Sequence, residues 1–241
     1  VVIGGGIVGC AVARKLALEG VTIVLLEKSA DILEGASKGN SAILHTGFDA
    51  PEDSLELECV RNGYAEYLEI RKSLNLPLLE TGALVAAWTE EEEECFSRIL
   101  EKAQNNGIDD LRLMSQTETL AMEPNISGSL RSAISVPREF VIDPWSAPLA
   151  YLSQAVSNGG QAIFNAEVAG GEFSGNHWLL ESKRGTIRAQ YVINCAGLYG
   201  DYLDTAVLGK SAFKIKPRKG QFVVFDKEAC SLIKTIILPV P

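Results

Sequence analysis

The chain has 241 residues, 46% of them apolar, enough to bury the core of one large domain or two intertwined ones. Its formal net charge of −9 argues against a nucleic acid as the main partner, because phosphate backbones are bound by clustered Lys and Arg. Five scattered cysteines without a C-x-x-C pair, and only two histidines, argue against a metal site. Cysteines in this pattern predict reduced thiols in the cytoplasm or an organelle matrix, with Cys10 and Cys195 as small buried residues.

The first 26 residues predict a strand, a helix and a second strand. The apolar runs 1–3 and 21–26 have the length of buried strands, and neither is long enough to span a membrane. Between them, residues 7–19 place apolar side chains near one helix face, and Gly20 ends the helix. Residues 29–51 are rich in Gly, Ser, Asn and Asp and predict a long loop, which in compact domains is usually functional.

The remaining chain predicts an alternation of helices and short strands. One of these helices begins with Asp143 as its N-cap and Pro144 at its first helical position, and runs to about residue 158. Gly175-Asn176 predicts the turn of a β-hairpin. The other predicted helices cover residues 54–74, 90–104 and 115–122 and a short stretch after Gly200. The other predicted strands cover residues 81–88, 130–136, 161–168, 172–173, 178–182, 187–194, 213–216 and 221–225.

This order predicts an α/β fold with a discontinuous domain organisation. A Rossmann-like nucleotide domain over 1–80 and 144–211 is interrupted by a strand-rich α+β substrate domain over 81–143 and 212–241. Val1 falls inside a predicted strand and Pro241 follows an apolar run directly, so we expect the chain to be a fragment whose substrate domain is incomplete at its C-terminus.

The hexapeptide Gly4–Gly9 fits the dinucleotide-binding pattern G-x-G-x-x-G. In that pattern Gly4 permits the tight turn, Gly6 lets the backbone approach a pyrophosphate, and Gly9 lets the helix pack closely on the strand. The pyrophosphate then lies at the N-terminus of the helix, beside Ile7 and Val8, where free N–H groups favour negative charge. The hexapeptide alone is a weak signal, but here it has a strand before it and a helix after it.

Glu27 ends the second predicted strand, where an acidic residue can accept hydrogen bonds from a ribose hydroxyl. The whole fingerprint therefore predicts a bound dinucleotide. It does not decide between NAD and FAD.

Three segments resemble the flavoprotein superfamily that includes D-amino-acid oxidase, glycine and sarcosine oxidases, flavin-linked glycerol-3-phosphate dehydrogenase and L-2-hydroxyglutarate oxidase. They are residues 1–11 continuing through Leu25-Leu26-Glu27-Lys28, residues 35–47 (GASKGNSAILHTG), and residues 191–200 (YVINCAGLYG). The second segment and the run Lys216–Gln221 look most like the glycerol-3-phosphate dehydrogenase and 2-hydroxyglutarate oxidase branch.

The resemblance implies FAD as the cofactor and assigns residues to it. Lys28, Ser37, Lys38, Asn40, Ser41, Ala196 and Gly197 are expected near the cofactor, and Val168 resembles the position whose backbone meets the adenine. Ser and Asn are also ordinary turn residues, so simple loop chemistry is the competing interpretation for residues 37–41.

The resemblance also implies oxidation of a C–H bond beside a hydroxyl in a small anionic substrate, such as glycerol 3-phosphate or a 2-hydroxy acid. His45 is the candidate base for the hydroxyl proton. Alternatively, it tunes the flavin, carries a covalent flavin link, or only hydrogen-bonds its loop. The alternative functions are amine or amino-acid oxidation and a flavin-binding subunit that is inactive without a partner. The electron acceptor is left open between oxygen, a quinone and a protein.

Overall fold

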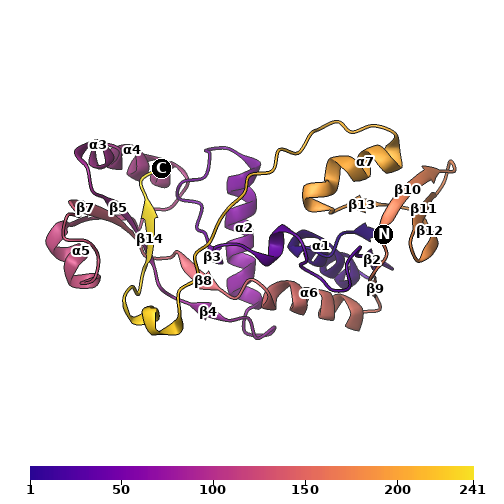
Figure 1. Ribbon diagram of the computed structural model, residues 1–241, viewed down its shortest axis with the longest axis horizontal. Coiled ribbons are helices and arrows are strands. Elements are labelled where there is room, and N and C mark those ends of the chain that lie inside the picture. Colours follow the sequence, from indigo (N-terminus) through magenta and orange to yellow (C-terminus); the bar gives the residue numbers. More distant parts are fainter. The chain divides into compact units, whose positions relative to one another are not determined.

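The computed structural model describes residues 1–241, which form two compact units (Figure 1). The first unit consists of Val1–Ser41 and Pro144–Gln221, and the second of Ala42–Asp143 and Phe222–Pro241. The unit that carries the glycine-rich turn is therefore built from two stretches that are far apart in sequence.

A parallel four-stranded sheet forms the centre of the first unit. Its strands lie in the order β13 (Ile193–Asn194), β1 (Val2–Ile3), β2 (Val24–Leu26), β9 (Gln161–Ile163). The helix α1 (Ile7–Leu18) connects β1 to β2. The predicted strand, helix and strand at the start of the chain are thus confirmed.

Both faces of this parallel sheet are covered. Val2 packs with side chains of α1 and of α6 (Ser146–Ser157), which lie side by side (Figure 1). Ile3, the next residue, packs on the opposite face with Leu180 and Leu203, as expected from the alternation of side chains along a strand. That second layer consists of α7 (Gly200–Leu208) and an antiparallel sheet of β10 (Val168–Phe173), β11 (Trp178–Ser182) and β12 (Gly185–Ala189).

The second unit contains two further sheets. One has the order β14 (Ile236–Pro239), β5 (Ala83–Ala87), β7 (Ser132–Val136), β6 (Arg112–Ser115), and the other the order β3 (Ile43–Leu44), β8 (Phe140–Ile142), β4 (Leu78–Leu79). Its helices are α2 (Leu55–Ile70), α3 (Glu90–Glu94), α4 (Phe96–Asn105) and α5 (Gln116–Met122). Phe96 and Ile99 of α4 pack on β5 and β7 to form its core.

Two predicted strands are wrong. Residues 213–216 and 221–225 form no strand and pair with no strand, although residues 213, 215 and 222–225 are apolar. Val223 and Val224 are 80% and 90% exposed. A β-prone sequence becomes a strand only where a neighbouring strand completes its hydrogen bonds, and the chain offers none here.

Several boundaries also differ from prediction. α6 starts at Ser146, because residues 144 and 145 form a turn, and Trp145 instead of Asp143 is the N-cap residue. The predicted helix over 90–104 is divided at Cys95, whose N–H bonds to the carbonyl of Glu92, three residues back instead of four. The predicted strand over 187–194 is divided between β12 and β13.

Residues 42–80 lie in the second unit, whereas the sequence predicts them in the nucleotide domain; residues 212–221 lie in the first unit, whereas the sequence predicts them in the substrate domain. For residues 42–80 the reason is strand pairing, since β3 and β4 both pair with β8. No helix combines the length and apolarity that crossing a bilayer requires.

Candidate functional site

The turn after β1 depends on two glycines. Gly4 has a φ of +113°, and a Cβ atom there would lie 2.3 Å from the carbonyl oxygen of Cys195. Gly9 lies in the first turns of α1, and a Cβ there would lie 1.8 Å from the carbonyl oxygen of Gly4. Neither position has room for a side chain, so the helix begins directly against the turn.

The N-terminus of α1 is open to a ligand. Gly6 is the N-cap residue and supplies no side-chain cap. The first N–H groups of any helix have no acceptor within the helix, so they can bind an anion. Of these groups, the N–H of Ile7 donates to Ser37 Oγ at 3.1 Å. Gly6, Ile7, Val8 and Ser37 all line the same cavity, so an anion bound there meets both the helix terminus and the serine.

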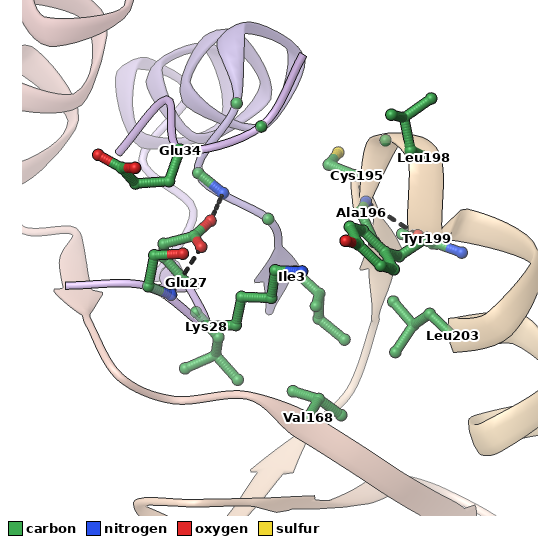
Figure 2. Close-up of a pocket in the computed structure, with 18 of the residues that line it drawn as sticks. Ile3, Glu27, Lys28, Glu34, Val168, Cys195, Ala196, Leu198, Tyr199 and Leu203 are labelled. Atoms are coloured by element: carbon green, nitrogen blue, oxygen red, sulfur yellow. Dashed lines mark hydrogen bonds between the residues drawn. The ribbon is translucent and has the colours of Figure 1, made fainter. Parts of the chain in front are cut away.

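Glu27 follows β2 and is only 8% exposed. Its Oε2 accepts the N–H of Gly5 at 2.6 Å, and its Oε1 accepts the N–H of Ser29 at 2.8 Å (Figure 2). The two hydrogen bonds fix the carboxylate at the edge of the cavity. A carboxylate held there has further lone pairs for the hydroxyl groups of a ribose.

The cavity has a volume of about 490 Å³ and lies wholly within the first unit. Figure 2 shows Glu27 and Lys28 on one side of it and Ala196, Tyr199 and Leu203 on the other, with Val168 from β10 between them. Lys28 Nζ lies 3.4 Å from the centre of the Tyr199 ring, within the range of a cation–π interaction. The cavity is thus closed by segments from both stretches of the unit.

Most of the sequence-predicted cofactor residues meet at this cavity. Those that line it are Gly4, Gly6, Ile7, Val8, Glu27, Lys28, Ser37, Val168, Ala196 and Gly197. Gly9 is buried behind the turn. Lys38, Asn40 and Ser41 do not line it: Lys38 Nζ pairs with Glu34 at 3.0 Å, and Asn40 Nδ2 donates to the carbonyl of Ser37.

These features fit the adenosine diphosphate portion of a dinucleotide such as FAD. A volume of this size is ordinary for a small-molecule site. The helix N-terminus suits the pyrophosphate, the Glu27 carboxylate suits a ribose, and apolar walls that include Leu26 and Leu203 suit an adenine.

The two cysteines near the turn are neutral thiols. Burial, together with the charge of Glu27 and the neighbouring Cys195, raises the pKa of Cys10 to about 12. Burial also raises the pKa of Cys195. Cys10 is fully buried, as the sequence predicts, whereas Cys195 is half-buried and lines the cavity.

His45 lies in the second unit, just after β3. Its Nδ1 is 2.7 Å from Oε2 of Glu139, a side chain that is 0% exposed. The hydrogen bond to Glu139 raises the pKa of His45; burial opposes this shift, and the charges of Glu139 and Asp49 add to it. The imidazole of His45, which can accept a proton, is therefore in direct contact with the buried carboxylate of Glu139.

Sequence reasoning missed Glu139, Tyr199 and Leu203 as site residues. Glu139 is a single acidic residue between apolar runs, which is a weak signal, and it meets His45 only because β3 and β8 are paired. Tyr199 and Leu203 follow the predicted Ala196-Gly197 turn, so continuing that segment by one helical turn would have included them.

Comparisons with known proteins agree with this geometry. A family model described as FAD dependent oxidoreductase matches residues 1–241. Glycerol 3-phosphate dehydrogenase of Caloramator mitchellensis is 32% identical over 240 residues, which cover 100% of this chain and 50% of that protein. Mitochondrial L-2-hydroxyglutarate dehydrogenase of Homo sapiens is 31% identical over 255 residues, which cover 100% of this chain and 55% of that protein.

A solved structure has the same fold. L-alpha-glycerophosphate oxidase from Mycoplasma pneumoniae with FAD bound superimposes with a TM-score of 0.85 at 22% identity, covering 100% of this chain and 64% of that one. The predicted α/β class with a Rossmann-like FAD-binding domain is thereby confirmed. The chain spans about half the length of the curated relatives it matches.

Proposed function

The chain belongs to the FAD-dependent oxidoreductase family, and from that premise we propose that it oxidises the CH–OH group of a small anionic substrate, either glycerol 3-phosphate or a 2-hydroxy acid such as 2-hydroxyglutarate. The names of the relatives from Caloramator mitchellensis and Homo sapiens support these two substrates. In this proposal the first unit holds the cofactor, and the second unit contributes to the substrate domain.

The proposed FAD site is the cavity of the first unit. The N-terminus of α1, with Gly4, Gly6, Ile7 and Val8, holds the pyrophosphate, while Gly9 keeps the helix close to the turn. Glu27 binds the ribose, and the other proposed contacts are Lys28, Ser37, Val168, Ala196 and Gly197. Lys38, Asn40 and Ser41 are proposed to face the flavin portion, outside the cavity that the adenosine portion fills.

The observation that carries the proposed reaction is the pairing of His45 with the buried carboxylate of Glu139. Bound FAD supplies the acceptor for the hydride that leaves the substrate carbon. An alcohol must also lose its O–H proton, and a neutral imidazole is suited to take it. We assign this role to His45, with flavin tuning and a covalent flavin link as the competing roles.

An absorption spectrum of the purified full-length protein tests the cofactor. Flavin absorbance that acid precipitation releases into the supernatant indicates non-covalent FAD, whereas colour retained in the pellet indicates a covalent link and makes His45 the first residue to replace. A protein without flavin absorbance, even after FAD has been added, contradicts the proposal.

Bleaching of that absorbance under anaerobic conditions tests the substrate. We expect glycerol 3-phosphate or L-2-hydroxyglutarate to reduce the flavin and glycine and sarcosine to leave it oxidised. Reduction by the amines alone would establish amine oxidation instead, and reduction by none of them would favour a flavin-binding subunit that needs a partner. Reoxidation by oxygen, a quinone or a protein then identifies the electron acceptor. An intracellular, reducing location stays a prediction.

A further inference from the structure

We propose that Glu139 is a positioning residue for this reaction: it keeps the proton of neutral His45 on Nδ1 and so makes Nε2 the nitrogen that accepts the substrate proton. The inference rests on the proposed function, because it assumes that His45 is the base. It adds the residue that determines which of the two ring nitrogens can act, and it is argued from contacts within the second unit alone.

The carboxylate of Glu139 is held firmly. Its Oε1 accepts two hydrogen bonds from Thr46, one from the backbone N–H at 2.6 Å and one from the side-chain hydroxyl at 2.7 Å. Thr46 is itself 3% exposed. Because Thr46 follows His45 directly in the chain, the same carboxylate fixes both the backbone next to the histidine and the ring itself.

The other oxygen of this carboxylate determines the tautomer. Oε2 of Glu139 is fully buried and forms no hydrogen bond of standard geometry; the one ring nitrogen recorded against it is His45 Nδ1, 2.7 Å away, at ion-pair distance. An unprotonated Nδ1 would place two acceptors against each other and leave a buried carboxylate oxygen without a donor, which is unfavourable because that oxygen has lost its water and gained no partner. The proton of the neutral ring therefore belongs on Nδ1, and the lone pair on Nε2.

The imidazole of His45 is accessible, whereas its carboxylate partner is not. The side chain of His45 is 45% exposed, while that of Glu139 is 0% exposed. A small substrate can thus reach the imidazole although it cannot reach the carboxylate. A buried carboxylate that orients an accessible imidazole is the arrangement in which the imidazole acts as base and the carboxylate acts through it.

Most of the surrounding charged and titratable groups have other partners. Arg138 pairs with Asp110 at 2.6 Å, and the hydroxyl of Tyr64 donates to the carbonyl of Arg138. Asp49 is exposed and adds to the raised pKa of His45. Two further cations lie near this loop, the Lys102 ammonium on the carbonyl of Asp49 and the Arg61 guanidinium beside Gly107. Glu139 is thus the group that His45 Nδ1 meets directly.

The first test is an NMR titration of the full-length FAD-bound protein labelled with ¹⁵N-histidine. At a pH where His45 is neutral, we expect its Nδ1 to carry the proton and its Nε2 to be bare. Comparison with the spectrum of His45→Asn assigns the His45 signals. A bare Nδ1 in the neutral ring would overturn the inference.

The second test is Glu139→Gln. The amide oxygen can still accept both hydrogen bonds from Thr46, but the amide nitrogen then faces Nδ1 as a donor and forces the ring proton onto Nε2. We expect kcat to fall by about 10²-fold or more, the usual contribution of a general base.

The same variant should also change the pH profile. His45 must be neutral to act, so kcat/KM rises with pH through the pKa of His45. Because Glu139 raises that pKa, the variant's acidic limb should move to lower pH.

Two controls separate positioning from general damage. Glu123→Gln changes another buried carboxylate, which accepts the backbone N–H of Lys234, and should leave the His45 tautomer and kcat unchanged. In a His45→Asn background, Glu139→Gln should lower kcat no further. An equal further loss in that background would show that Glu139 acts independently of His45. The expected tautomer in a protein that oxidises no alcohol would count against the proposed function instead.

Discussion

Single atoms decide whether the glycine-rich turn can form. A Cβ at Gly9 would lie 1.8 Å from the carbonyl oxygen of Gly4, a backbone atom that cannot move away alone. We therefore expect Gly9→Ala to push α1 off the turn and to destabilise the protein by at least about 1–3 kcal/mol, the usual cost of overpacking. Denaturant unfolding measures the loss, and the flavin content of the purified variant should fall as well.

Gly128→Ala is the matched control for that substitution. Gly128 lies in the second unit, outside the proposed cofactor site, and a Cβ there would meet no atom within 4 Å. Its stability and flavin content should match those of the unchanged protein. If Gly9→Ala also retained both, the close approach of helix and turn would not be what Gly9 provides.

At the level of single residues, a prediction can be made where the signal is local. Glu27 was predicted from its place at the end of a strand, and the structure puts it at the cavity beside the turn. Glu139 was not predicted, because it meets His45 and Thr46 across 93 and more residues of chain. Such a pairing depends on which strands become neighbours, and a pattern along the sequence does not contain that information.

At the scale of elements, α2 offers a test of helix propensity without packing effects. Gly63 lies inside this helix, is exposed, and has no atom within 4 Å of the position that a Cβ would take. Gly63→Ala should therefore stabilise the protein by about 1 kcal/mol, since alanine restricts the unfolded chain and favours the helix. Thermal unfolding should show a rise of roughly 2–4 °C. An unchanged or lower midpoint would contradict this reasoning.

Elements with their own start and stop signals were predicted well, whereas the errors concentrate on strands that depend on a distant partner. The start of α2 is capped by Ser54, whose hydroxyl accepts the N–H of Leu57, and the predicted helix starts there. β14, in contrast, forms because it lies parallel to β5, some 150 residues earlier in the chain. Residues 222–225 show the reverse, with apolar side chains but no partner strand.

At the scale of the whole molecule, the sequence predicted that the chain leaves the nucleotide domain and returns to it near residue 144. The structure has two compact units with that return point, but the chain leaves the first unit already after Ser41. The larger difference lies in residues 42–80, whose short strands pair with β8. A strand of two residues is too short to give a hydrophobic pattern, so its sheet cannot be assigned from sequence.

The division into two units makes FAD binding a local event with a measurable signature. Every residue that lines the cavity belongs to the first unit. A ligand that binds only the folded form stabilises it by about 2.7 kcal/mol at a concentration 100 times its dissociation constant.

After FAD is added to the FAD-free protein at that concentration, amides of α1 and β13 that exchange through opening of the first unit should therefore exchange about 100-fold more slowly. Amides of β5 and β7, in the core of the second unit, should change less if the two units open independently. Hydrogen exchange read by mass spectrometry measures both sets in one experiment. Equal slowing in both would show that the two units unfold together, and no slowing in α1 or β13 would refute the cavity as the cofactor site.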